Sequence, residues 1–336
     1  MASPSLPARS SAARGTAEAP RRAPLRSRLL VAGLGGLSAL LSRLPDGLLH
    51  RLAHAAGALL YWLRPARRAL VRGNLLRVCR HLAAAGLVAP GSAAHSAAEG
   101  GRALDRLTRA AFGHYVRGYL EVLLLAAYAR RPDGPPIETD DPALAAEAFG
   151  SNAGRGRAII LIGMHFGAIE IPGLWTSRQG LRLTAPMETL ADPSLQAYLE
   201  QKRGVLGLRI VPLGAAGREL RAALARGEAV ALIADRLVGG SGARVELFGS
   251  PARLPVGAAV LALESGAPAW LAVTRRLGWG GYRVFLERIE LPAEGPRRER
   301  LASFLTAQAS AFERAVAKAP EQWWALFFPI WTEEAR

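Results

Sequence analysis

The second half of the chain alternates short apolar runs with helix-like stretches, and this alternation limits the folds that it can adopt. The apolar runs cover residues 158–162, 183–187, 208–213, 230–234, 269–274 and 282–289. Short strands that are apolar throughout are typical of a sheet buried on both faces, where the helices between them form the crossover connections. The pattern therefore predicts an α/β fold with a mostly parallel central sheet flanked by helices.

A helical section precedes this sheet. Apolar residues recur at steps of three and four over residues 48–63, after a Pro45-Asp46 start signal, and again over residues 104–129. Arg64, Arg68 and Arg72 follow the first helix at four-residue steps. Such a combination is typical of a helix that lies on anionic lipid, and equally of a core helix with a solvated basic face.

Three regions follow from composition. Residues 1–28 hold six arginines and one acidic residue among Ser, Pro and Ala, so we expect a basic mobile leader. Residues 29–130 form a helical membrane-associating section, whose first apolar run, 29–41, is shorter than the roughly 20 residues that span a bilayer. Residues 131–336 form the α/β core, which makes one catalytic unit with the helices before it.

Charge, cysteine and histidine content limit the partners and metal sites that can be expected. The formal net charge of +16 suits anionic lipid, phosphorylated substrates or nucleic acid. No zinc-finger or RNA-recognition pattern is present, so we expect no nucleic-acid partner, although the charge keeps nucleic-acid binding as a lesser alternative. The single cysteine, Cys79, is expected to be a small buried hydrophobe. No H-E-x-x-H pattern is present, and His50 and His54, four residues apart, are expected to be helix-face residues, so no metal site is predicted.

His165 lies three residues after the apolar run 158–162, with Glu170 five residues later and Gly163 and Gly167 on either side of the histidine. Ligands of open α/β sheets bind beyond the carboxyl ends of the strands. A histidine there can take a proton near neutral pH, and a neighbouring acid can orient its ring. The segment thus predicts a general base. The alternative interpretation is that His165 and Glu170 are two surface residues without a catalytic role.

Further segments complete a larger pattern. They are Pro186-Met187-Glu188, Ala234-Asp235-Arg236, the string F-G-S-P-A-R-L-P-V-G at 248–257 and P-E-Q-W-W at 320–324. In this order, together with the His165 segment, they resemble the lysophospholipid acyltransferase family, in particular its bacterial branch of lipid A and phosphatidylinositol mannoside acyltransferases. The resemblance covers about residues 45–331.

The resemblance implies a glycerolphosphate-acyltransferase-like fold and a membrane-associated O-acyltransferase. His165 would be the general base, Glu170 would orient its ring, and Gly167 matches the family glycine. The donor would be acyl-CoA or acyl carrier protein, with no permanently bound cofactor, and the acceptor a hydroxyl of a glycolipid or lysophospholipid. Membrane lipids would be its partners at the cytoplasmic face of the inner membrane, where the protein would be peripheral or shallowly inserted.

Other residues are expected to bind substrate. These are Gly167, Glu188, Asp235, Arg236 and Arg253. Arg253 could clamp a phosphate or headgroup, or form a salt bridge with Asp235 or Glu188, and Asp235 could pair with Arg236 to hold the floor of the site.

Two features of the resemblance leave alternatives open. Ala168 and Ile169 stand where the family often has Asn and Trp, which puts acceptor preference in doubt and leaves an inactive membrane-binding homologue as a further alternative. The tryptophans Trp323, Trp324 and Trp331 fit core packing somewhat better than a membrane interface. The acceptor, the acyl chain length and the oligomeric state do not follow from the sequence.

Overall fold

The computed structural model describes residues 24–131, 135–150, 156–237, 242–278 and 280–331. The mobile leader was predicted for residues 1–28; residues 1–23 lie outside the described residues, while residues 25–28 are already helical. The helices of the front section are α1 (Leu25–Leu41), α2 (Asp46–Leu63), α3 (Pro65–Ala84), α4 (Ala93–Ala97) and α5 (Gly101–Arg130).

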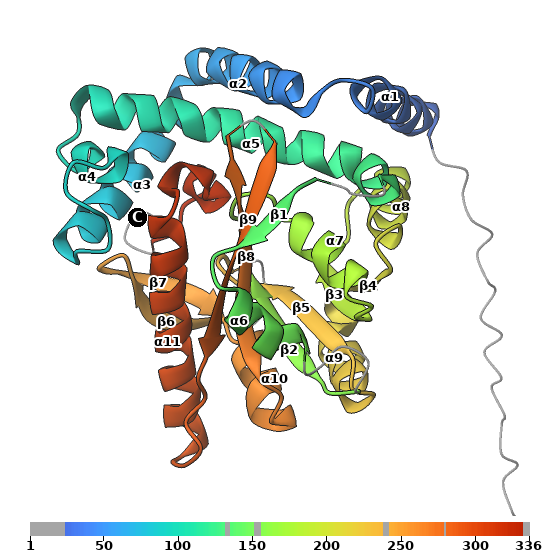
Figure 1. The fold of residues 1–336 in the computed structure, drawn as a ribbon, viewed down its shortest axis with the longest axis vertical. Coiled ribbons are helices and arrows are strands. Elements are labelled where there is room, and N and C mark those ends of the chain that lie inside the picture. The colour runs from blue at the N-terminus through green and yellow to red at the C-terminus, as the bar shows by residue number, and fades with distance from the viewer. Residues whose placement is uncertain (1–23, 132–134, 151–155, 238–241, 279, 332–336) are drawn as a thin grey trace, which may run out of the picture.

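Helix α2 lies along the long helix α5, on one side of the molecule (Figure 1). The buried residues of α2 recur at four-residue steps and are Leu49, Ala53, Gly57 and Tyr61. Gly57 faces Gly113 of α5 so closely that an added Cβ would lie 2.5 Å from the Gly113 backbone. The two glycines therefore let the helix backbones approach.

The outer surfaces of α1 and α2 remain apolar. The predicted apolar stripe of residues 48–63 is only partly buried, because its other large side chains point to solvent. The exposed large hydrophobic residues of these two helices are Leu25, Leu29, Leu30, Leu37, Leu40, Leu48, Leu52, Leu59, Trp62 and Leu63. Within the described part of the chain, no helix combines the length and the hydropathy needed to cross a bilayer.

The six predicted strands are confirmed, and together with β1, which was not predicted, they form one seven-stranded sheet (Figure 1). Its order is β1-β9-β8-β2-β5-β3-β4, and all neighbours are parallel except the β8–β9 hairpin. The strands are β1 (Ile137–Thr139), β2 (Ile159–Gly163), β3 (Leu183–Met187), β4 (Leu208–Pro212), β5 (Ala229–Ile233), β8 (Ala269–Leu277) and β9 (Gly281–Ile289). The mostly parallel α/β prediction thus holds.

Helices connect these strands and pack against the sheet. They are α6 (Pro142–Ala145), α7 (Ile171–Arg178), α8 (Pro193–Gly204), α9 (Ala216–Ala225), α10 (Gly257–Ser265) and α11 (Arg297–Ala317), followed by two short 3-10 turns, Pro320–Gln322 and Trp324–Phe327. Strands β6 (Gly242–Leu247) and β7 (Ser250–Pro255) form a separate antiparallel hairpin that the sequence analysis missed.

Strand β2 is buried on both faces, as its unbroken apolar sequence predicts. Ile160 and Ile162 join a cluster that includes Leu75 of α3 and Phe112 of α5, whereas Ile159 belongs to a second cluster on the opposite face. The first cluster runs without a break from the front helices into the sheet. Packing of the helical section therefore helps to position the carboxyl end of β2, where His165 lies.

Candidate functional site

The parallel pairing of β2 with β5 brings His165 and Asp235 together. The register sets Gly163 opposite Ile233, the last residues of the two strands. Each strand continues two residues further before its polar side chain, so His165 and Asp235 come to lie opposite each other. The hydrogen bond from Ala234 N to Gly163 O, 3.0 Å long, extends the pairing beyond the strand ends.

Asp235 binds the His165 ring. The distance from His165 Nδ1 to Asp235 Oδ1 is 2.8 Å, and the backbone N–H of His165 donates to Oδ2 at 3.0 Å. Trp323 Nε1 donates to the same Oδ2 at 2.8 Å. The Asp235 side chain is fully buried, whereas that of His165 is 29% exposed. The carboxylate of the pair is thus sealed from solvent, whereas the imidazole keeps access to it.

These contacts fix the charge state of Asp235 and the tautomer of the ring. Burial alone would raise the pKa of Asp235, but the charge and hydrogen bonds of His165 and the bond from Trp323 hold that pKa below its ordinary value. An ionised carboxylate only accepts hydrogen bonds, so His165 Nδ1 carries the proton that is donated to Asp235. The Nε2 atom is then left with its lone pair, which is the state a general base requires.

The C-terminal segment closes the site from the other side. Trp324 N donates to His165 O at 2.6 Å, and Phe166 forms an isolated bridge with Trp323. Trp323 is fully buried and Trp331 is 2% exposed, which confirms core packing for both. Two of the sequence motifs are thus in physical contact, because the P-E-Q-W-W segment lies against the histidine loop.

Glu170 does not bond to the His165 ring, which corrects the prediction that it orients the imidazole. Its two oxygens accept hydrogen bonds from Arg203 Nε and Nη2, the shortest being 2.7 Å. Glu170 lies immediately before α7, after a turn in which Gly167 adopts a φ of +53°. The chain therefore reverses between the two residues and carries the carboxylate toward α8, which contributes Arg203.

A cavity of about 140 Å³ lies beside the histidine loop. Its walls come from the sheet and from the start of α7, and they are mostly apolar; among the lining residues are Leu161, Met164, Phe166, Ile169, Leu183, Ile210, Ile233 and Val273. Glu170 and Arg203 supply its charged part. Met164 and Phe166, the chain neighbours of His165, line this cavity, whereas His165 itself is not among the lining residues. The histidine loop thus borders an apolar chamber with a polar end.

The remaining predicted substrate-binding residues are more dispersed. Gly167 lies in the loop itself, where an added Cβ would be 1.9 Å from Thr274 O. Glu188 is exposed after β3 and is not part of the cavity lining. Arg236 does not pair with Asp235, which is occupied by His165 and Trp323, and instead lies over the ring of Phe328 at 4.2 Å.

Arg253 is exposed on β7, where its guanidinium donates to Gly242 O at 2.9 Å. The alternative of a salt bridge to Asp235 or Glu188 is therefore wrong. The P-A-R-L-P string, with a proline at each end, forms one strand of the two-stranded hairpin of β6 and β7. Such a strand tolerates proline, because part of its edge has no partner that needs an N–H donor.

Sequence reasoning missed two functional features. One is the contact of Asp235 with the ring; its signal was that a titratable residue closely follows each of the two apolar runs 158–162 and 230–234. The other is Arg203, which lies in the last turn of α8, in an ordinary charged surface sequence that gave no distinguishing signal.

Comparison with known proteins matches the chain to one family model and to curated relatives. Residues 138–331 match the family model described as bacterial lipid A biosynthesis acyltransferase. A phosphatidylinositol mannoside acyltransferase of Mycobacterium tuberculosis is 31% identical over 178 residues, which is 51% of this chain and 53% of that protein. The enzyme of the same name from Mycolicibacterium smegmatis is 27% identical over 228 residues, 65% of this chain and 70% of that protein. The matches thus span from about half to about two thirds of these relatives.

Proposed function

Because the chain belongs to the family of bacterial lipid A biosynthesis acyltransferases, we propose that it moves a fatty acyl group from a thioester donor to a hydroxyl group of a glycolipid. The observation that carries this proposal is the contact of His165 with Asp235 beside an apolar cavity. A base with a free Nε2 can activate a hydroxyl, and an apolar chamber suits a hydrocarbon chain.

In the proposed reaction, His165 Nε2 takes the proton of the acceptor hydroxyl as its oxygen attacks the thioester carbonyl. The new ester C–O bond forms, the C–S bond breaks, and the imidazolium returns its proton to the leaving thiolate. Asp235 holds Nδ1–H throughout and stabilises the positive ring. Transfer is direct, without an acyl-enzyme, because among the described residues no serine or cysteine hydrogen-bonds to the His165 ring, whose partner is Asp235.

Arg203 gives the cavity a positive group at its polar end. Its side chain is 25% exposed and is fixed by Glu170. A guanidinium held in this way can donate to the carbonyl oxygen of the thioester, on which negative charge develops, or to a phosphate of either substrate. Glu170 thus acts in the proposal by orienting Arg203.

The names of the relatives support a phosphatidylinositol mannoside as the acceptor, although lipid A precursors and lysophospholipids belong to the same chemical class of hydroxyl-bearing membrane lipids. Acyl-CoA and acyl carrier protein remain the two donor candidates. Ile169 lines the cavity, so this departure from the family pattern acts on the shape of the chamber, whereas Ala168 is fully buried in the core.

We further propose that the protein binds the cytoplasmic face of the inner membrane through α1 and α2. The support is their exposed apolar surface, of which Trp62 is 64% and Leu29 63% exposed. Arg28, Arg43 and Arg64 lie exposed on or next to the same helices. Apolar side chains beside arginines favour the interface of an anionic bilayer.

The proposed transfer is tested with purified protein, a radiolabelled palmitoyl thioester on CoA or on acyl carrier protein, and vesicles that contain each acceptor lipid. His165→Ala is expected to lower the turnover at least about 100-fold, because removal of a general base typically costs this much. His95→Ala on α4 is the matched control and should keep wild-type turnover. Transfer by His165→Ala at the wild-type rate would refute the mechanism.

A further inference from the structure

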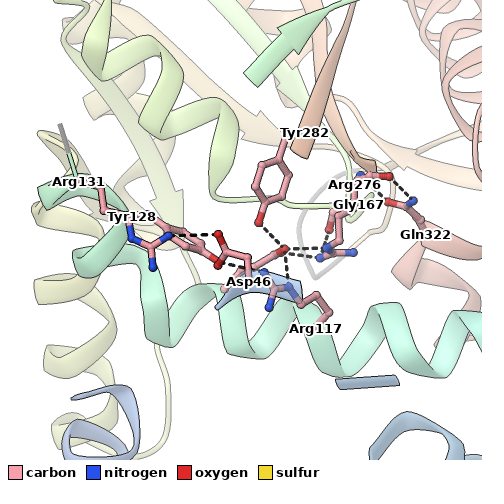
Figure 2. Close-up of polar contacts among 9 residues, drawn as sticks. Asp46, Arg117, Tyr128, Arg131, Gly167, Arg276, Tyr282 and Gln322 are labelled. Carbon is pink, nitrogen blue, oxygen red and sulfur yellow. Dashed lines mark hydrogen bonds and ion pairs between the residues drawn. The ribbon is translucent and has the colours of Figure 1, made fainter. Parts of the chain in front are cut away.

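A buried ionic network lies behind the histidine loop, between α5 and the β8–β9 hairpin (Figure 2). Arg276 of β8 is 6% exposed and Glu121 of α5 is 2% exposed. The guanidinium donates from Nε to Glu121 Oε1 at 2.8 Å and from Nη2 to Oε2 at 2.6 Å. The hydroxyl of Tyr282 donates to the same Oε1 at 2.9 Å.

Arg276 also contacts the loop that carries the base. Its Nη2 donates to Gly167 O at 2.7 Å, two residues after His165 (Figure 2). The guanidinium therefore bridges the long helix α5 and the loop. Because Glu121 holds it through two bonds, the planar group has little freedom to rotate, and the position of the Gly167 carbonyl is fixed with it.

Gln322 completes the hold on Gly167. Its side chain accepts from Arg276 N at 2.9 Å and donates to Arg276 O at 3.1 Å, while its own backbone carbonyl accepts from Gly167 N at 2.9 Å (Figure 2). Both backbone polar groups of Gly167 are thus bound by residues 276 and 322. Gly167 has a left-handed φ of +53°, and an added Cβ would lie 1.9 Å from Thr274 O, so the turn requires glycine at this position.

A buried ion pair of this kind is not explained by stability alone, since apolar residues of similar volume often stabilise a fold as well or better. What the pair supplies is direction, because a guanidinium places its donors at fixed angles. We propose that Arg276 is a positioning residue that holds the His165 loop at the distance at which the ring meets Asp235 and the acceptor. This inference rests on the acyl transfer proposed above and adds the device that aligns its base.

The network offers a matched pair of variants. Arg276→Gln removes the donors to Gly167 O, whereas Tyr282→Phe removes one hydrogen bond to the same Glu121 and leaves Arg276 in place. Displacing a reacting group by about 1 Å can cost about 100-fold in rate. We therefore expect Arg276→Gln to lower kcat about 10- to 100-fold with less than about a twofold change in the KM of the thioester. Tyr282→Phe should stay within about twofold of wild type in both constants.

Hydrogen exchange measured by mass spectrometry gives a readout that needs no activity. The peptide covering residues 164–170 is expected to exchange faster in Arg276→Gln than in Tyr282→Phe, while peptides of α11 exchange alike. Equal exchange of this peptide in the two variants, or an unchanged kcat in folded Arg276→Gln, would overturn the positioning role. If Arg276→Gln fails to fold, Glu121→Gln takes its place, with the same expected order of effects.

The two proposals fail in distinguishable ways. If the wild-type protein transfers no acyl group from any thioester, the proposed function fails, and the exchange of the 164–170 peptide still decides whether Arg276 holds the loop. If wild type transfers acyl groups and His165→Ala does not, but Arg276→Gln keeps full kcat, only the positioning inference fails.

Discussion

The two carboxylates nearest in sequence and in space to the histidine loop serve different partners. On the β5 side of the loop, Asp235 is fully buried and binds the His165 ring. On the α7 side, Glu170 binds the partly exposed Arg203. A separation of five residues thus gave no ring contact, whereas a separation of 70 did. Strand order, rather than closeness along the chain, decides which acid orients the base.

The largest loss of acyl-transfer rate is expected from a change at Asp235, on the β5 side of the loop. Asp235→Asn should lower kcat by roughly two to four orders of magnitude, because an amide can favour the wrong ring tautomer and does not stabilise the imidazolium. Steady-state transfer of a labelled acyl group measures this, with Trp323→Phe as a control that removes a single bond to the same carboxylate. A loss below about threefold in folded Asp235→Asn would contradict the assignment.

On the α7 side, stability should suffer together with activity. Glu170→Gln leaves Arg203 without its charge partner. Breaking a buried pair costs about 3–5 kcal/mol, and the partial exposure of Arg203 reduces our expectation to about 1–3 kcal/mol in the free energy of unfolding. Urea denaturation measures this loss. We expect turnover to fall about tenfold, since the ring keeps its partner.

The double variant Glu170→Gln/Arg203→Met separates the two contributions on this side. It should recover part of the lost stability, because no uncompensated charge is left near the cavity. Turnover should not recover, since the donor at the polar end of the cavity is gone. Full recovery of turnover would remove Arg203 from the proposed mechanism.

Membrane binding through the exposed surface of α1 and α2 should not depend on either carboxylate. Trp62→Ser is expected to weaken binding to anionic vesicles about tenfold or more, because burying one large apolar side chain contributes about 1.5–3 kcal/mol. Flotation with labelled vesicles measures the bound fraction. Leu213→Ser, which changes an exposed leucine after β4, is the matched control. An equal decrease for both variants would argue against a specific role of α2.

The smallest expected effect is a change of stability with pH, which separates the histidines of helices α2 and α5 from the site. Burial, followed by the charges of His50 and Arg276, lowers the pKa of His54 to about 4. The unfolded chain takes up this proton near the ordinary value of 6.5, so the folded state loses stability as the pH falls from about 6.5 toward 4.

Asp235 acts in another range of pH. Its pKa is lowered, so its contribution to stability is present above the ordinary value of 3.8 and is lost only as the pH falls further through the folded-state value. The change in unfolding temperature between pH 7 and pH 4.5 should therefore reflect the protonation of the histidines of α2 and α5, such as His54. His54→Gln should flatten this dependence, and an unchanged slope would contradict the pKa assigned to His54.

Sequence reasoning located most of the sheet and the position of the base. The apolar runs marked six of the seven strands of the sheet, and His165, three residues after the run at 158–162, proved to lie at the carboxyl edge of the sheet. The partner of His165 escaped prediction because periodicity does not give strand order. Only the adjacency of β2 and β5 places Asp235 beside the ring.

The direction of side chains was the second feature that the sequence did not predict. The stripe at residues 48–63 was predicted as one apolar face, yet the structure buries Leu49 and exposes Leu48 and Leu52. A helix with apolar residues around more than one face gives no signal for the face that meets the core. Glu170 was predicted beside the ring for a related reason, since the left-handed turn at Gly167 is not encoded in residue spacing.

The most direct test of the account combines variants in a cycle of acyl-transfer rates. If Asp235 acts through the ring, His165→Ala/Asp235→Asn should be no slower than His165→Ala alone, whereas His165→Ala/Glu170→Gln should lose a further factor of about ten. The reverse pattern, in which Glu170→Gln adds nothing to His165→Ala and Asp235→Asn lowers the rate further, would contradict the assignment of Asp235 as the partner of the base.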